Sequence, residues 1–175
     1  MSNEIYNFEA WINIVEPLPR ESISHFLGRF ERANLLTGYQ VGKEAGVGAI
    51  VTRWKKLYLN PFPTQQDLES LAKFVEVEVE KIKETLPLNG MTMKPRPIKL
   101  CAVCYAEEPY HRIEWQYKEQ QKCDRHNLRL LTKCTNCETP FPIPADWAQG
   151  ECTHCFLPFA KMAKGQKLYS LKCDT

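Results

Sequence analysis

The first 100 residues of this 175-residue chain contain no cysteine, and no part of the chain is a long apolar run. A membrane-spanning helix needs about 20 consecutive, mostly apolar residues, and no segment approaches that length. The opening residues, MSNEIYNFEA, are polar and acidic, without the apolar stretch of a secretory signal. We therefore expect a cytoplasmic protein with no membrane contact, in a compartment that keeps thiols reduced.

The sequence also lacks the usual marks of an enzyme. It has no glycine-rich phosphate-binding loop, no paired-carboxylate motif and no recognisable nucleophile with an adjacent base. Hydrophobic residues make up 43% of the chain and charged residues 25%, which is typical of a globular protein and not of a disordered one. We expect a folded protein without catalytic residues.

The second half of the chain, by contrast, is rich in metal ligands. Seven of its eight cysteines stand with one histidine in four pairs, each pair separated by two residues. Such a pair offers two ligands from one tight turn, and structural Zn²⁺ takes four ligands in a tetrahedron. The gaps within successive sets of pairs are 18 and 14 residues, each long enough for a hairpin. The spacing predicts two Zn²⁺ sites, the first formed by Cys101, Cys104, Cys123 and His126 and the second by Cys134, Cys137, Cys152 and Cys155.

Three other interpretations of these pairs fit less well. Buried free cysteines or a redox pair would not require four pairs in register, and His126 as a ligand disfavours an iron–sulfur cluster. A catalytic zinc keeps an open coordination position, whereas both predicted sites already have four protein ligands. We expect two structural ions, with His154 a solvent-facing bystander and Cys173 an unpaired thiol in the tail.

Strong charge of one sign is missing. The formal net charge is +2, divided into −2 over residues 1–90 and +4 over residues 91–175. Seven metal-bound thiolates and two Zn²⁺ ions would lower the second value to about +1. Nonspecific DNA binders usually have a clearly basic face. DNA contact should therefore be indirect or weak.

The first half of the chain has the periodicity of short helices. A helix is predicted to begin after Ser22 and to run to about Leu36, with four apolar residues on one face: Ile23, Phe26, Leu27 and Phe30. A turn, a short helix and another turn follow over 37–48, and a basic helix over 50–57. A capping box of Thr64 with Asp67 begins a further helix, and its tight joint to a helix over 78–86 predicts a helix-turn-helix.

The domain organisation follows from a change in composition. Residues 87–97 contain three prolines and a glycine, which predicts a boundary. We expect an α+β fold with a helical, helix-turn-helix-like domain over 1–88, a linker over 89–97, and tandem zinc-ribbon modules over 98–130 and 131–175, the second including the tail. In the first module, Ile113, Trp115 and Tyr117 alternate with polar residues, which predicts a strand with one buried face.

Two groups of residues are candidates for contact with partners. A basic cluster flanks the first zinc module, an arrangement common in RNA-binding zinc knuckles; its candidates are His111, Arg112, Lys118 and Lys122. A solvated face without a ligand explains that cluster equally well. In the apolar segment 11–15, Trp11 and Ile14 are candidates for a protein partner, against burial of Trp11 in its own domain.

Several motifs occur in a fixed order along the chain. Pro19-x-Glu21-Ser22-Ile23-Ser24 comes first, and Cys101-x-x-Cys104-Tyr105-Ala106-Glu107 follows the helical segment. After these come Arg112-x-x-Trp115, Cys123-Asp124-Arg125-His126-x-x-x-Leu130 and Cys134-Thr135-Asn136-Cys137. Over about residues 10–160 this order resembles the TniQ family, although Arg20 stands where the family usually has glycine. The short length and the run His25-Phe26-Leu27-Gly28-Arg29-Phe30 are similar to the small members found in cyanobacterial CRISPR-associated transposons of the single-effector type.

This resemblance implies a non-catalytic, bacterial adaptor in DNA transposition, with a helix-turn-helix domain and tandem zinc ribbons. It implies that the chain bridges an RNA-guided CRISPR effector complex, with its guide RNA, to an AAA+ transposition regulator on DNA. In this family a separate transposase cuts and joins DNA. One rival hypothesis is a sequence-specific DNA-binding regulator that uses the helix-turn-helix, but the glutamates at 78–86 count against it. A zinc hydrolase or nuclease, the other rival, lacks an open coordination position.

Overall fold

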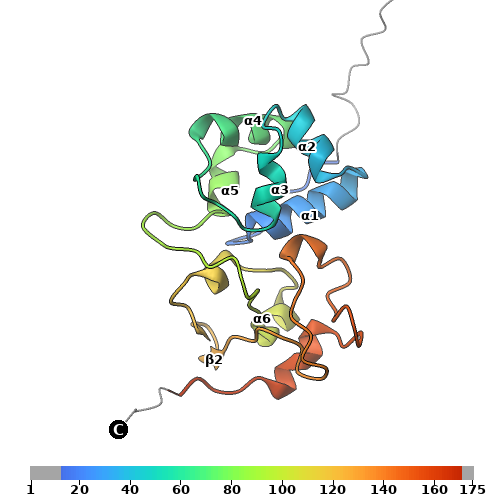
Figure 1. Cartoon of the computed structure of the whole chain (residues 1–175), viewed down its shortest axis with the longest axis vertical. Coiled ribbons are helices and arrows are strands. Elements are labelled where there is room, and N and C mark those ends of the chain that lie inside the picture. The colour runs from blue at the N-terminus through green and yellow to red at the C-terminus, as the bar shows by residue number, and fades with distance from the viewer. Residues whose placement is uncertain (1–12, 171–175) are drawn as a thin grey trace, which may run out of the picture.

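The computed structural model describes residues 13–170, which form two lobes stacked along the long axis of the molecule (Figure 1). The upper lobe contains α1 (Ile23–Asn34), α2 (Gly38–Glu44), α3 (Ile50–Lys55), α4 (Gln65–Val75) and α5 (Val79–Glu84). The lower lobe contains α6 (Ala102–Glu107), the 3₁₀ helices η2 (Ile113–Gln116), η3 (Pro144–Asp146) and η4 (Phe159–Gly165), and an antiparallel pair of strands, β1 (Lys122–Cys123) and β2 (Leu128–Arg129).

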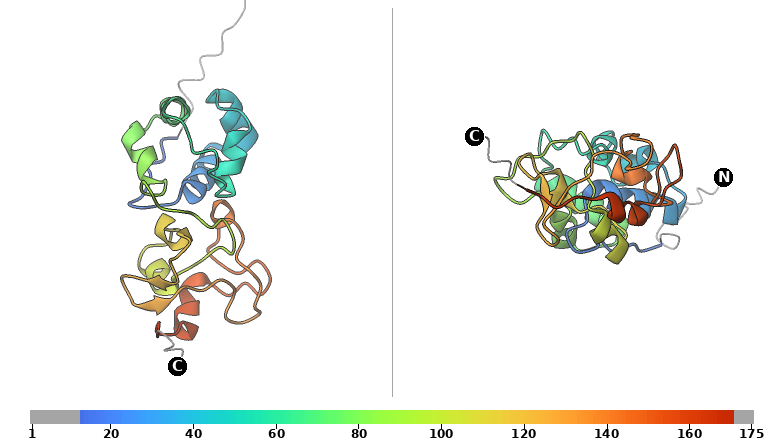
Figure 2. Two further views of the ribbon diagram at one scale, coloured as in Figure 1. Left: turned by 60° about the vertical axis from the view of Figure 1, so that its left-hand side comes forward. Right: turned by 90° about the horizontal axis from the view of Figure 1, so that it is seen from below.

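The left view of Figure 2 shows the same stacking after a turn about the long axis. A helical domain followed by two cysteine-rich modules is the α+β class that the sequence predicted. Within residues 13–170, no helix is both long and apolar enough to cross a membrane. Trp11 and Cys173 lie outside the described residues.

The helix α1 begins and ends close to where the sequence predicted. The Ser22 side chain accepts a hydrogen bond from the amide of His25 (3.3 Å), and the helix ends at Leu35, whose φ is 54°. The four predicted apolar residues are fully buried. His25 and Glu31 are buried too, although helical spacing puts them on other sides. The His25 ring packs against Trp147 of the lower lobe, whereas the Glu31 carboxylate pairs with Lys55 of α3.

The helices α4 and α5 form the predicted tight pair. The Thr64 hydroxyl accepts a hydrogen bond from the Asp67 amide (3.1 Å), and the Asp67 carboxylate accepts one from the Thr64 amide (3.0 Å), which confirms the capping box. The chain leaves α4 at Glu76, whose φ is 57°, and enters α5 three residues later. α5 is short and exposes charges of both signs.

The strand predicted over residues 113–117 is wrong, because this segment is the 3₁₀ helix η2. Its three apolar residues are buried as expected, but Gln116 is fully buried as well. The Gln116 side chain donates to the carbonyls of Lys94 (2.7 Å) and Pro97 (3.2 Å) and accepts from the Lys99 amide (2.6 Å). A strand would point Gln116 away from the core and break these bonds to the linker.

The two lobes share one hydrophobic core. Gly28 of α1 lies so close to Ala145 of η3 that a Cβ on Gly28 would stand 2.2 Å from the Ala145 carbonyl oxygen. The Ala145 amide donates to the Ser24 hydroxyl (3.1 Å), and its carbonyl accepts from the Arg32 guanidinium (2.6 Å). The domain boundary predicted at residues 89–97 stays a prediction. The contacts of Ala145 with α1 hold the parts of the chain before and after it together.

Aromatic rings fill the junction between the lobes. The buried Trp147 ring lies at their centre, and its Nε1 donates to the Pro142 carbonyl at 3.1 Å. Five rings contact it edge-on or nearly so: His25, Tyr105, His111, Phe141 and Phe159. These rings come from the upper lobe and from both cysteine-rich modules, so the junction depends on all three parts.

Candidate metal centres

Each predicted pair of ligands lies on a turn of the same construction. The amide of the residue after the second ligand donates to the carbonyl of the first, over N–O distances of 2.7 to 3.1 Å. The donors are Tyr105, Asn127, Glu138 and Phe156. Three of these residues have a left-handed backbone, with φ of 52°, 60° and 58° for Asn127, Glu138 and Phe156, whereas Tyr105 continues into α6. This turn brings both ligand atoms of a pair to the same side.

The first centre combines α6 with the β1–β2 turn. Its ligand atoms all lie within 4.8 Å of one another. His126 Nδ1 is 3.8, 3.3 and 3.6 Å from the sulfurs of Cys101, Cys104 and Cys123, and the last two sulfurs are 3.4 Å apart. The other ring nitrogen of His126 lies 3.0 Å from the Glu107 carboxylate. A carboxylate behind a histidine in this way is typical of metal-bound imidazole.

The second centre is formed by two loops that flank η3. The Cys134 and Cys155 sulfurs are 3.6 Å apart, and those of Cys137 and Cys152 are 3.5 Å apart. The Asn136 amide points at the Cys134 sulfur (3.4 Å). The Thr139 hydroxyl, 3.2 Å from the Cys137 sulfur, lowers the pKa of that thiol to about 6. Hydrogen bonds to sulfur favour the thiolate, which is the form that binds metal.

Both sets of ligands fit a tetrahedral metal ion. The sulfur–sulfur distances of 3.4 to 3.6 Å are far longer than a disulfide bond of about 2.05 Å. Metal–sulfur bonds of about 2.3 Å in a tetrahedron put the sulfurs roughly 3.8 Å apart, close to what is seen. Four protein ligands at each centre would leave no position for water or substrate. His154 is exposed and belongs to neither cluster.

The Glu107 carboxylate was not anticipated from the sequence. It lies three residues after Cys104 on α6, and this spacing places two side chains on one side of a helix. Arg125 also pairs with Glu107 (3.0 Å) and with Glu108 (3.2 Å). Arg112, a member of the predicted basic cluster, also pairs with Glu108. The first centre is therefore bordered by an ion-pair network that neutralises part of that cluster.

The structure corrects the predicted basic surface at two of its four residues. His111 is fully buried and Arg112 is 7% exposed. The reason is backbone pairing across the junction, because the Ser22 amide donates to the His111 carbonyl (2.9 Å) and the Ile113 amide to the Arg20 carbonyl (2.9 Å). Lys118 is exposed and Lys122 is partly exposed, so these two remain accessible.

Burial also changes the chemistry of His111. Its Nδ1 lies 2.9 Å from the Ser22 hydroxyl, and its Nε2 has no hydrogen-bond partner. Burial, with a smaller contribution from the charge of nearby His25, lowers the pKa of His111 to about 3. The ring is thus neutral at pH 7 and packs against Trp147 in the junction between the lobes.

Comparison with models of known protein families gives a match. A family model described as TniQ matches residues 13–130, which is more than half of the chain and includes the first centre. No curated protein matches the chain.

Replacing one cysteine in either centre should remove the metal ion of that centre and leave the other in place. We expect two metal ions per chain, and one fewer after Cys104→Ser or Cys137→Ser, because a hydroxyl is a poor substitute for a thiolate. His154→Ala is the matched control and should keep both ions. Elemental analysis of purified protein measures this directly. One ion or none in the unaltered chain would contradict the assignment.

Acid should destabilise the protein partly through His111. Its folded pKa, about 3, lies below the value of about 6.5 in an unfolded chain. The unfolded state therefore takes up a proton first, and stability present above pH 6.5 is lost as pH falls, by up to about 1.4 kcal/mol per pH unit. The free energy of unfolding, measured with urea, should differ less between pH 7 and pH 5.5 for His111→Gln than for the unaltered chain. His154→Gln, the control, should keep the full difference; an equal acid response in all three would contradict the burial argument.

Proposed function

The chain belongs to the TniQ family, and from this premise we propose that it is a non-catalytic adaptor that selects target sites for DNA transposition. The observation that carries the proposal is the family match, which extends from the helical lobe into the first centre. Both candidate metal centres already have four protein ligands, which favours a structural role for the metal over hydrolysis.

We assign Zn²⁺ to both centres. The ligands are seven thiolates and one imidazole, a donor set typical of structural zinc. Zinc in such a site supplies folding free energy, on the order of 10–16 kcal/mol in isolated finger peptides. It would hold the loops of the lower lobe in place, while the contacts with partners are made by other residues.

The first proposed partner is an AAA+ transposition regulator, bound through the segment before α1. Ile14 is 57% exposed although it is a large apolar side chain. The segment is attached to the end of α1, since the Asn13 side chain donates to the Ala33 carbonyl at 2.9 Å. Leu35, at that same end of α1, is 92% exposed. Exposed apolar residues gathered at one place are typical of a protein interface, and Trp11 is the proposed anchor.

The second proposed partner is a guide RNA within a CRISPR effector complex. Of the four residues that the sequence suggested, Lys118 and Lys122 are accessible and stay in the proposal, whereas His111 and Arg112 do not. Two lysines neutralise few phosphates, so binding of RNA by the isolated protein should be weak and depend little on salt. Contact with DNA would be indirect, because α5 carries Glu80 and Glu84 beside its lysines.

Two variants should separate the proposed contacts. Trp11→Ala should weaken binding to the regulator roughly tenfold or more, without lowering the melting temperature. Lys118→Glu with Lys122→Glu should reduce guide-directed insertions while binding to the regulator persists. Each variant is the control for the other, and sequencing of insertion sites, with binding assays on purified partners, reads out both.

Two results would contradict the adaptor. Guide-directed insertion that continues without this chain would show that it does not select the target. Tight, sequence-specific binding to bare duplex DNA, lost on changing residues 78–86, would instead identify a DNA-binding regulator.

A further inference from the structure

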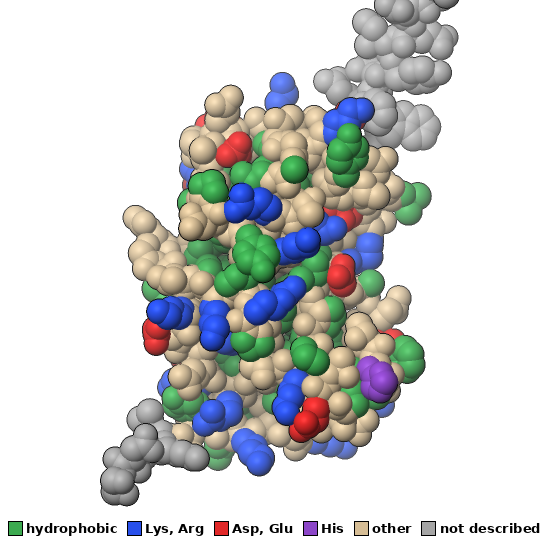
Figure 3. Space-filling view, in the orientation of Figure 1, with side chains coloured by type: hydrophobic (Ala, Val, Ile, Leu, Met, Phe, Trp, Pro, Cys, Tyr) green, Lys and Arg blue, Asp and Glu red, His purple; other side chains and the backbone are tan. Residues whose placement is uncertain are grey.

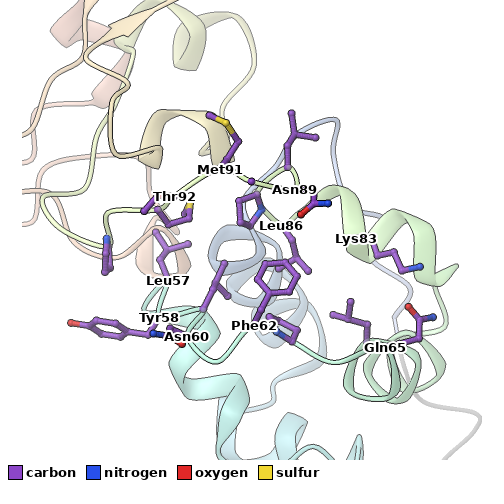
Figure 4. Close-up of a pocket in the computed structure, with 18 residues that line it drawn as sticks. Leu57, Tyr58, Asn60, Phe62, Gln65, Lys83, Leu86, Asn89, Met91 and Thr92 are labelled. Carbon is purple, nitrogen blue, oxygen red and sulfur yellow. The ribbon is translucent and has the colours of Figure 1, made fainter.

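We propose that a groove beside the linker docks an acidic, amphipathic peptide segment of a partner protein. The groove has a volume of about 690 Å³. It lies between residues 57–68, in the α3–α4 connection and the first turn of α4, and residues 83–95, at the end of α5 and in the segment that follows it. In Figure 4 the side chains of Phe62 and Leu86 lie at its centre, and Leu57 lies between Thr92 and Tyr58. Tyr58 lies at one side and Lys83 at the other.

The groove is lined by apolar side chains that nothing in the described chain covers. Phe62, Leu88 and Met91 are 44 to 59% exposed, and Tyr58 is similarly exposed. Large apolar side chains that are exposed together usually mark a surface that another molecule covers. The shape is held by the rest of the fold, because the Leu88 amide donates to the Tyr117 hydroxyl (3.3 Å) and the Lys118 amide to the Thr92 carbonyl (2.8 Å).

The charge around the groove is of one sign over long stretches of both walls. Residues 45–66 and 85–106 contain no Asp or Glu, and each stretch contains three Lys or Arg. Lys55 is paired with Glu31, and the Lys99 ammonium is bound to two carbonyls. Four exposed cations pair with no carboxylate of the described residues: Arg53, Lys56, Lys94 and Arg96. Arg53 and Arg96 donate only to the carbonyls of Asn60 and Pro95, which leaves their charge for a partner. Figure 3 shows Lys and Arg side chains around hydrophobic ones across the middle of this face.

The apolar floor of the groove and its basic surroundings together indicate the chemical class of the ligand. A peptide with Leu or Phe anchors would fill the groove, and its Asp or Glu side chains would reach the surrounding cations. Single-stranded RNA would need flat aromatic faces for its bases, but Leu and Met side chains outnumber aromatic ones here. Methionine adapts to varied apolar anchors, and Met91 and Met93 both line the groove. The proposal does not depend on the two partners named above.

The probe is a phage-displayed library of random 12-residue peptides. Peptides that bind the full metal-loaded chain are selected from it. Enriched peptides should combine bulky apolar residues with net negative charge. A synthetic peptide of the most enriched sequence should bind more weakly as salt rises. Its affinity should fall roughly tenfold or more in Phe62→Ser with Leu88→Ser, because both anchoring contacts are lost.

The control variant is Tyr39→Ser with Leu168→Ser, two exposed large side chains that do not line the groove. It should bind the peptide like the unaltered chain, and all three proteins should melt at similar temperatures. Three outcomes would overturn the proposal: no enrichment over an unrelated protein, equal loss in both variants, or binding that the groove variant leaves unchanged. Stronger binding of a 15-nucleotide unstructured RNA, abolished by the groove variant, would make the groove a nucleic-acid site instead.

Discussion

Two clusters of cysteine and histidine side chains bring separate segments of the lower lobe together. Its one sheet, among the described residues, has two strands of two residues each, and most of its backbone lies in turns and loops. Loops without regular hydrogen bonding lose conformational entropy on folding and gain little from secondary structure in return. Tetrahedral coordination of a metal ion at each cluster would supply that missing free energy. The four ligand turns, built alike, place Tyr105, Trp147 and Phe159 where their rings can pack together.

The upper lobe in turn uses the lower lobe as part of its core. Near the start of α1, the buried Glu21 carboxylate accepts hydrogen bonds from Arg29 (2.7 and 2.8 Å) and contacts His25. Burial alone would raise the pKa of Glu21, but these bonds outweigh it and the pKa is lowered. The charged carboxylate fixes the turn before α1, whose backbone pairs with residues 111–113. An adaptor built this way would hold partners bound to its two lobes at a fixed mutual orientation.

Local signals in the sequence predicted local structure well. The ligand turns need only two-residue gaps, and the caps of α1 and α4 need only a hydroxyl at the right residue. The failures involve contacts between distant residues. Gln116 bonds to residues 94–99, which turns an alternating pattern into a 3₁₀ helix, and His111 pairs with a segment 89 residues earlier. The periodicity of one segment does not indicate which distant segment it will contact. The burial of His111 and Arg112 therefore could not be predicted.

Amide hydrogen exchange, measured with and without a strong chelator, would show whether the metal centres hold the lower lobe and, through it, one side of α1. Removal of metal should raise exchange throughout residues 98–170 and in the part of α1 that faces Ala145. Amides of α4, which packs against α5 away from the junction, should stay protected. If residues 98–170 remain protected after elemental analysis shows the metal gone, packing alone holds the lobe and the metal centres do not.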